Sequence, residues 1–214
     1  MAAIEAVLFD FGGVFTASPF TAFDGVGEKL GARPGQIQQI VFGNYHEDGD
    51  HPWHRVERGE ISLEECRQAI MAHAQKDHGI ELDIYEVFAA MPRDGGIRQV
   101  LVDKVAELKE RGYRRAIITN NVREFSDGWR SLLPVDELFE LVVDSCREGV
   151  RKPDPAIFEL ALERMGLTDP ARVVFLDDFA GNIEAAKTLG MDAIHVTDDI
   201  GRAIAELDRR LASR

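Results

Sequence analysis

The chain has 214 residues, a formal net charge of −13 and two cysteines. This length is sufficient for one sizeable core with a smaller inserted unit. The negative charge argues against nucleic acid and anionic membranes as partners, because proteins that bind them normally carry a basic surface. Cys66 and Cys146 are far apart and show no CxxC or Cys/His spacing, so we expect neither a disulfide framework nor a zinc site. Because no run of about 18 apolar residues is present, we expect a cytoplasmic protein without a membrane span.

The first predicted element is a short strand that ends in a carboxylate. Residues 6–9 (AVLF) are apolar, and they are followed by Asp10, Phe11 and two glycines, Gly12 and Gly13. A continuous apolar run indicates a strand covered on both faces, as in a parallel sheet. Since such sheets bind ligands at the carboxyl ends of their strands, Asp10 is a candidate for chemistry.

A helical insertion is predicted next, between about residues 21 and 92. Its expected helices cover residues 34–42, 62–74 and 84–90. Ser62 and Glu65 form a capping box at the start of the second helix. The polar and histidine-rich segment 43–55 has two interpretations: a substrate-sensing loop that faces a cleft, or a solvated loop whose Trp53 packs on a neighbouring helix. The irregular histidine spacing disfavours a metal site there.

From Gly95 onward the sequence alternates helices with strands. Helices are predicted at residues 97–111, 126–133, 155–165, 182–189 and 200–211. Strands are predicted at residues 116–119, 141–144, 173–176 and 193–196. Together with strand 6–9, this alternation predicts an α/β fold with a Rossmann-like, doubly wound parallel sheet of five strands. The helical insertion follows the first strand.

Polar residues recur where these strands end. Asp10 follows the first strand, Thr119 ends the second, and Asp177 with Asp178 follows the fourth. Because neighbouring strands lie about 4.8 Å apart, these residues would gather within roughly 10 Å. Three carboxylates need a counter-charge, and Mg²⁺ prefers hard oxygen ligands; alternatively, one carboxyl group holds a proton. Lys152 lies in a loop with two prolines, although a lone lysine is most often exposed.

Four segments, in this order, resemble the four motifs of the haloacid dehalogenase-like (HAD) hydrolase superfamily. They are residues 9–14 (FDFGGV), 118–121 (ITNN), 151–155 (RKPDP) and 175–178 (FLDD). The stretch from Ser145 through Asp178 is similar in particular to the N-terminal phosphatase domain of soluble epoxide hydrolases. The resemblance implies the strand order 5-4-1-2-3, a core of residues 1–17 and 93–214, and a helical cap of residues 18–92.

The same resemblance implies a nucleophile and a metal site. Asp10 would attack a phosphoryl group and form an aspartyl-phosphate. Asp10, the backbone carbonyl of Gly12 and Asp178 would hold Mg²⁺. Asp177 would act on the metal through water or support its ligands.

The resemblance also implies a phosphate site. Thr119 and the amide of Asn120 would bind phosphoryl oxygens, and Lys152 would neutralise the charge that develops on them. The helix that starts near Asn182 would add a favourable amino-terminal dipole. The implied substrate is a small phosphorylated metabolite selected by the cap.

Gly12 departs from the pattern of the phosphatases in this superfamily, which usually carry a second aspartate at that position. A glycine cannot move a proton. Three interpretations stay open: Thr16, His46, His54 or a water acts as a substitute acid or base; the enzyme hydrolyses only esters with good leaving groups; or the protein is a vestigial, non-catalytic one that binds phosphate without turnover.

The 2-haloacid dehalogenases of the superfamily also lack that aspartate. Because they work without metal, they would have little use for the pair Asp177 and Asp178. The leading prediction is therefore a Mg²⁺-dependent hydrolase of a phosphorylated metabolite.

Overall fold

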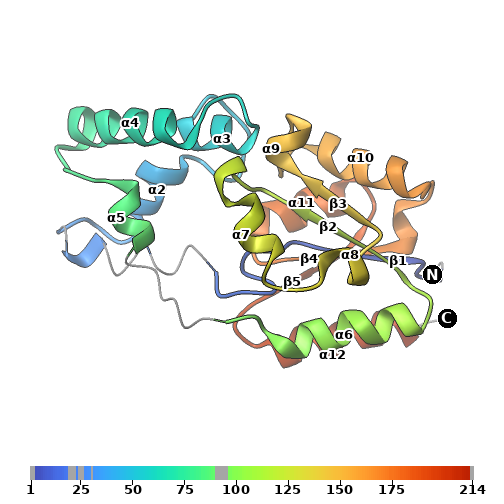
Figure 1. The fold of residues 1–214 in the computed structure, drawn as a ribbon. Coiled ribbons are helices and arrows are strands. Elements are labelled where there is room, and N and C mark those ends of the chain that lie inside the picture. Colours follow the sequence, from blue (N-terminus) through green and yellow to red (C-terminus); the bar gives the residue numbers. More distant parts are fainter. Residues whose placement is uncertain (1–2, 19–22, 24–26, 30, 90–95, 213–214) are drawn as a thin grey trace.

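A computed structural model describes residues 3–18, 23, 27–29, 31–89 and 96–212. Its centre is a parallel sheet of five strands in the order β3-β2-β1-β4-β5 (Figure 1). The strands are β1 (Ala6–Phe9), β2 (Arg114–Thr119), β3 (Leu141–Asp144), β4 (Val173–Asp177) and β5 (Asp192–His195). This order confirms the predicted one, counted from the other edge. β1 pairs with both β2 and β4, so the residues that follow these three strands converge at one edge.

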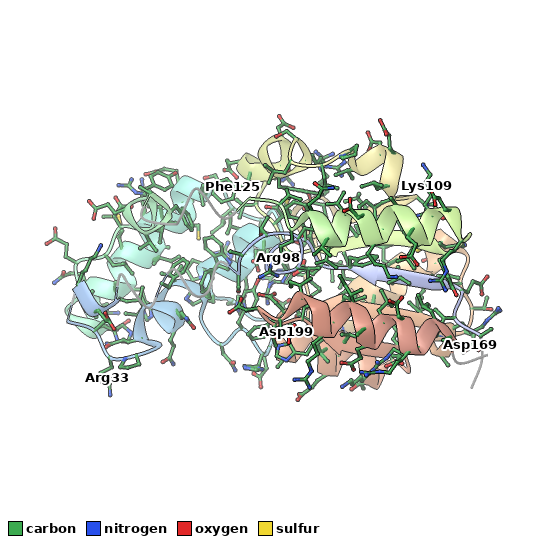
Figure 2. All side chains as sticks on the ribbon, turned by 90° about the horizontal axis from the view of Figure 1, so that it is seen from below. Arg33, Arg98, Lys109, Phe125, Asp169 and Asp199 are labelled. Carbon is green, nitrogen blue, oxygen red and sulfur yellow. The ribbon has the colours of Figure 1, made fainter. Side chains whose placement is uncertain are left out.

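Helices cover both faces of the sheet. They are α6 (Gln99–Glu110) and α12 (Ile200–Ala212) on one face, and α10 (Pro155–Met165) and α11 (Ala180–Thr188) on the other. Figure 2 shows α6 and α12 side by side across the first face. Since side chains alternate along a strand, Val7 and Phe9 pack on this face and Ala6 and Leu8 on the opposite one. All four are fully buried, which explains the apolar run.

The helices of the predicted insertion lie together beyond the carboxyl ends of the strands (Figure 1). They are α2 (Gln36–Phe42), α3 (Pro52–Glu57), α4 (Leu63–His73), a π-helical turn (Ala74–His78) and α5 (Ile84–Ala89). Their apolar side chains form a hydrophobic cluster separate from those of the sheet. We call the predicted core of residues 1–17 and 93–214 the sheet domain; its Val122 also belongs to the cap cluster. We call residues 18–92 the cap; these limits stay a prediction, and residues 90–95 lie outside the described part.

Ser62 begins α4 as predicted. Its hydroxyl accepts a hydrogen bond from the backbone N–H of Glu65 at 3.2 Å, and the Glu65 carboxylate accepts one from the backbone N–H of Ser62 at 2.7 Å. This reciprocal capping box satisfies two backbone donors that the helix itself cannot satisfy.

Several predicted boundaries are wrong. Segment 43–55 is not a loop throughout, because α3 begins at Pro52, where a proline at the first helical position costs no hydrogen bond. The helix expected at residues 126–133 is the shorter α7 (Ser126–Arg130), and α11 begins at Ala180 rather than near Asn182. Unpredicted short segments are α8 (Val135–Leu138), α9 (Ser145–Glu148) and the 3₁₀ turns Arg123–Phe125 and Pro170–Arg172. Single turns are too short to show a helical period.

None of the helices in the described ranges is both long enough and apolar enough to cross a membrane.

Candidate active site

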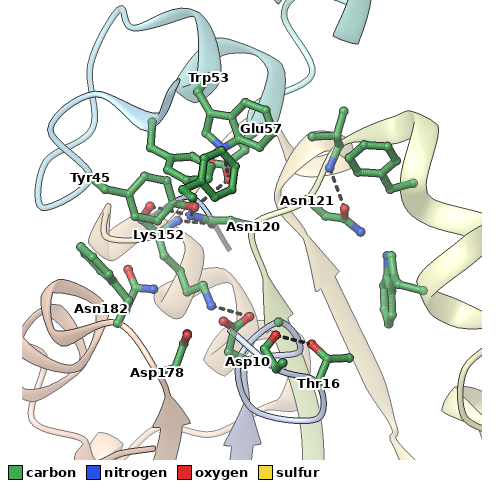
Figure 3. Close-up of a pocket in the computed structure, with 18 of the residues that line it drawn as sticks. Asp10, Thr16, Tyr45, Trp53, Glu57, Asn120, Asn121, Lys152, Asp178 and Asn182 are labelled. Atoms are coloured by element: carbon green, nitrogen blue, oxygen red, sulfur yellow. Dashed lines mark hydrogen bonds and ion pairs between the residues drawn. The ribbon is translucent and has the colours of Figure 1, made fainter. Parts of the chain in front are cut away.

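Three carboxylates and one ammonium group meet at the carboxyl ends of β1 and β4. Figure 3 shows three of these side chains, Asp10, Asp178 and Lys152, with the ammonium group of the lysine directed toward Asp10. Asp10 follows β1, and Asp177 and Asp178 end and follow β4; one oxygen of each lies within 4.8 Å of the others. Lys152 reaches them from the loop before α10, with its Nζ 2.8 Å from Asp10 Oδ1 and 2.7 Å from Asp177 Oδ2. Since Lys152 is only 1% exposed, its interpretation as an ordinary surface lysine is wrong.

The two acidic neighbours Asp177 and Asp178 have different surroundings. Asp177 is fully buried and accepts hydrogen bonds from the backbone N–H of Phe179 at 2.7 Å and from Asn182 Nδ2 at 3.0 and 3.1 Å. Asp178 lines a cavity and accepts a hydrogen bond from Ser18 Oγ at 2.6 Å. Asp177 therefore binds the lysine from the buried side of the cluster, whereas Asp178 faces the cavity that Asp10 also lines.

The cluster holds one positive charge, that of Lys152, against three carboxyl groups. Burial raises the pKa of Asp10 to about 8, with Asp177 and Asp178 adding to the rise and Lys152 opposing it. Burial and the charge of Asp177 also raise the pKa of Asp178 to about 6. Three carboxyl groups thus share one ammonium group, and a divalent cation would relieve their repulsion. Asp10, Gly12 and Asp178 line the same cavity and offer hard oxygen donors, so the residues present fit Mg²⁺.

The loop after β1 places its two glycines in different environments. Gly13 has φ +74°, and a Cβ there would lie 1.9 Å from Asp178 Oδ2, so only glycine fits. Gly12 has no positive φ, and a Cβ there would meet no atom of the described residues within 4 Å. Arg98, labelled at the start of α6 in Figure 2, holds this loop by donating to the carbonyls of Gly13 at 2.5 Å and Val14 at 3.2 Å.

Thr119 and Asn120 occupy the end of β2. Thr119 is 4% exposed and is not among the residues that line the cavity, whereas Asn120 lines it. Asn120 Oδ1 accepts from the backbone N–H of Lys152 at 2.7 Å, and Asn120 Nδ2 donates to the Lys152 carbonyl at 2.9 Å. The side chain of Asn120 therefore fixes the lysine loop, a contact that the sequence pattern does not predict. The phosphate-binding roles of Thr119 and the Asn120 amide stay predictions.

A cavity of about 400 Å³ lies in front of the carboxylate cluster. Its polar end contains Asp10, Gly12, Lys152 and Asp178. Much of the remaining wall is aromatic and comes from both the cap and the sheet domain: Phe23, Phe42, Trp53, Phe88, Phe125 and Trp129. The site thus joins a charged floor to a predominantly apolar chamber.

The three candidate substitute acids lie at different places. Thr16 lines the cavity. His46 lines a neighbouring cavity that also contains Asp178. His54 is buried within the cap, where its Nε2 lies 2.8 Å from the Phe42 carbonyl, and it lines neither cavity. Of the three, Thr16 therefore shares the cavity with Asp10.

Segment 43–55 contributes to the cavity wall through Tyr45 and Trp53. Trp53 is also buried in the hydrophobic cluster of the cap. The segment therefore faces a cavity and its tryptophan packs on neighbouring helices, while substrate sensing stays a prediction. The sequence pattern gives no signal for the buried ion pair between Arg151 and Glu57, of which Glu57 lines the cavity and Arg151 does not. In the sequence, Arg151 stands out only as the neighbour of Lys152 in the segment RKPDP, which does not predict its burial or its partner.

The comparisons with known proteins agree with this arrangement. A family model for haloacid dehalogenase-like hydrolases matches residues 4–190. Mouse acyl-CoA dehydrogenase family member 10 is 33% identical over 97% of this chain, which spans 19% of that protein. Pig bifunctional epoxide hydrolase 2 is 30% identical over 97% of the chain, which spans 39% of it. A sesquiterpene phosphatase of Aspergillus oryzae is 28% identical, with 92% of this chain and 91% of that protein covered.

Among solved structures, a HAD-family enzyme of Bacteroides thetaiotaomicron, in complex with magnesium and inorganic phosphate, shares the fold. The TM-score is 0.62 at 23% identity, with 92% of this chain and 96% of that chain covered. These matches confirm the resemblance drawn from the four sequence segments and the Rossmann-like α/β architecture. The chain therefore belongs to the haloacid dehalogenase-like hydrolases.

Proposed function

We propose that this protein is a Mg²⁺-dependent phosphatase of small phosphate monoesters whose organic group is largely apolar. The cavity carries this proposal, since Asp10, Lys152 and Asp178 lie at its floor and aromatic side chains line its wall. Similarity to a protein named as a sesquiterpene phosphatase supports both the reaction and the apolar substrate. We place the protein in the cytoplasm, where its two free cysteines would stay reduced.

Asp10 is the proposed nucleophile. One carboxylate oxygen bonds to phosphorus while the bond from phosphorus to the ester oxygen breaks, which gives an aspartyl-phosphate and the free alcohol. A water then attacks phosphorus while the bond from phosphorus to the Asp10 oxygen breaks, which releases inorganic phosphate together with the protons of the water and restores the Asp10 carboxylate. Lys152 Nζ, 2.8 Å from Asp10 Oδ1, offsets the negative charge of the phosphoryl oxygens, and Asp177 holds that ammonium group in place.

Asp10, Asp178 and the Gly12 carbonyl would hold Mg²⁺, with Asp177 acting through water or as a support for the ligands. When bound, the ion screens the repulsion between the nucleophilic carboxylate and the phosphate dianion. The Asn120 amide and Thr119 are the further proposed phosphate donors.

Proton transfer to the leaving group is the step of this mechanism that lacks an assigned carboxylic acid. Gly12 supplies no acid, so the proton comes from water or from the Thr16 hydroxyl at the cavity wall. Esters with good leaving groups need less assistance and are the favoured substrates.

The test is steady-state hydrolysis of 1-naphthyl phosphate with and without Mg²⁺, by the wild type and by Asp10→Asn. We expect activity that depends on Mg²⁺ and that Asp10→Asn abolishes, because the amide keeps the shape of the carboxylate but is not a nucleophile. Turnover without metal, or an active Asp10→Asn variant, would refute the proposal. A preference for glycerol phosphate over the naphthyl ester would refute the apolar substrate class.

Gly12 favours a second candidate function, a vestigial protein that binds phosphate without turnover. In that case inorganic phosphate with Mg²⁺ would raise the melting temperature while no ester in a broad panel is consumed. A metal-independent 2-haloacid dehalogenase is less favoured, because three clustered carboxyl groups suit a cation. Release of halide from a 2-haloacid without metal would identify that activity.

A further inference from the structure

We infer that Arg151 is a positioning residue, which holds the aromatic wall of the cap over the phosphoryl site through its buried ion pair with Glu57. Arg151 belongs to the loop before α10 and does not itself line the cavity. The inference rests on the proposed function only where it concerns substrate binding.

The ion pair joins the sheet domain to the cap. Arg151 is fully buried, and its Nε donates to Glu57 Oε2 at 2.7 Å. Glu57 is the last residue of α3 and is 3% exposed. The Nη1 of Arg151 lies 3.4 Å from Asp48 Oδ1, so one cation from the sheet domain meets two carboxylates of the cap. Charges this deeply buried are stable only when they are paired and hydrogen-bonded.

Glu57 uses its other oxygen to orient the cavity wall. Its Oε1 accepts from Tyr45 OH at 2.6 Å and from Trp53 Nε1 at 2.8 Å, and both aromatic residues line the cavity. Figure 3 shows Tyr45, Trp53 and Glu57 grouped at the cap side of the pocket. The guanidinium of Arg151 also lies over the Tyr45 ring, 4.4 Å from its centroid. The pair therefore determines where two side chains of the wall stand.

The contacts continue to the lysine of the phosphoryl site. Tyr45 OH accepts a hydrogen bond from Asn120 Nδ2 at 3.3 Å, and the Asn120 side chain bonds to both the N–H and the carbonyl of Lys152. Since Lys152 directly follows Arg151, the chain of contacts closes on itself. The position of the cap is in this way tied to that of the lysine loop.

Removing one member of such a pair leaves the other charge buried and uncompensated, whereas removing both charges is often close to neutral. Arg151→Met should therefore displace Glu57 and the two aromatic residues that it holds. The double variant Arg151→Met/Glu57→Gln should restore them, because glutamine keeps an oxygen for Tyr45 and Trp53 without a charge. A pair that serves only overall stability would lower the melting temperature and leave substrate binding by the folded enzyme unchanged.

The first experiment is amide hydrogen exchange of residues 43–58 in the wild type, Arg151→Met and the double variant. We expect exchange to accelerate by at least about tenfold in Arg151→Met and to return toward the wild-type rate in the double variant. Arg164→Met is the matched control, because Arg164 pairs with Glu148 at 2.6 Å on the exposed side of α10. Unchanged exchange in a folded Arg151→Met variant, or equal acceleration in the control, would overturn the inference.

The second experiment measures kinetics with 1-naphthyl phosphate. Arg151→Met should raise KM by about tenfold or more and change kcat less, while the inhibition constant of inorganic phosphate changes by less than about threefold, because the apolar group contacts the cap. A fall in kcat alone would contradict this. The exchange experiment does not depend on turnover. If the protein hydrolyses no ester, the proposed function is refuted, while hydrogen exchange still tests the positioning role of Arg151. If Arg151→Met does not fold, Arg151→Lys serves for both readouts. Lysine keeps the charge but lacks the planar guanidinium that contacts Glu57 and the Tyr45 ring, so a smaller effect in the same direction is expected.

Discussion

Gly12→Asp is expected to increase the turnover of alkyl phosphates by roughly 10²- to 10⁴-fold, the usual contribution of general acid–base catalysis. Gly12 lies two residues after Asp10 and lines the same cavity. A side chain there has room, because a Cβ would meet no described atom within 4 Å and the backbone does not have a positive φ. The new carboxyl group would protonate the leaving alcohol and then activate the water.

The expected gain corresponds to roughly 2.7–5.5 kcal/mol of activation free energy, at about 1.36 kcal/mol for each factor of ten in rate. The effect on the free energy of unfolding should be small when Mg²⁺ is present. Replacing a glycine at a compatible backbone position stabilises by about 0.4–1 kcal/mol. A further carboxylate beside Asp10 and Asp178 opposes this gain, and the metal offsets the added repulsion.

The assay compares 1-naphthyl phosphate with an alkyl phosphate of similar size at saturating Mg²⁺. The gain should be larger for the alkyl ester, because its leaving group needs more protonation. Gly12→Asn has nearly the same size and transfers no proton, so it should show no gain. Gly13→Ala should lose activity, since its Cβ would overlap Asp178. Equal rates for folded Gly12→Asp and Gly12→Asn would refute the reasoning.

Three further predictions concern pH, thiols and the loop after β1. Burial lowers the pKa of His54 to about 4, so the unfolded chain takes up this proton first and stability falls as pH decreases from about 6.5 toward 4. His54→Leu should show a smaller fall in melting temperature between pH 7 and pH 5; an identical fall would contradict the assignment. Burial raises the pKa of the Cys66 and Cys146 thiols to about 12, so a thiol-specific disulfide reagent should label them only as fast as the protein unfolds. Arg98→Met should reduce kcat by about tenfold, because it removes two hydrogen bonds to the loop of Gly13, each worth roughly 0.5–1.5 kcal/mol. Arg98→Lys should reduce kcat by less. Unchanged kcat in Arg98→Met would exclude this role.

Local patterns were sufficient for the elements that form the centre of the fold. The apolar run before Asp10 is β1, because a strand buried on both faces needs apolar residues at every position. The capping box at Ser62 begins α4 because its bonds involve residues three apart. Short helices such as α8 and α9 are not predicted from the sequence, since a single turn shows no helical period. The structure of segment 43–55 is only partly predictable from the sequence, because the position of Trp53 depends on the helices that pack around it.

The sequence by itself determined the sheet, its flanking helices and, through four resembling segments, the residues at its carboxyl edge. These follow from apolar periodicity and from short motifs, which are local in the chain. Only the tertiary structure decided that the Lys152 ammonium is buried between Asp10 and Asp177, that a Cβ fits at position 12, and that Arg151 meets Glu57. The last two residues are 94 positions apart in the sequence. Such a contact depends on how the cap packs against the sheet domain, and no local pattern of side chains encodes that packing.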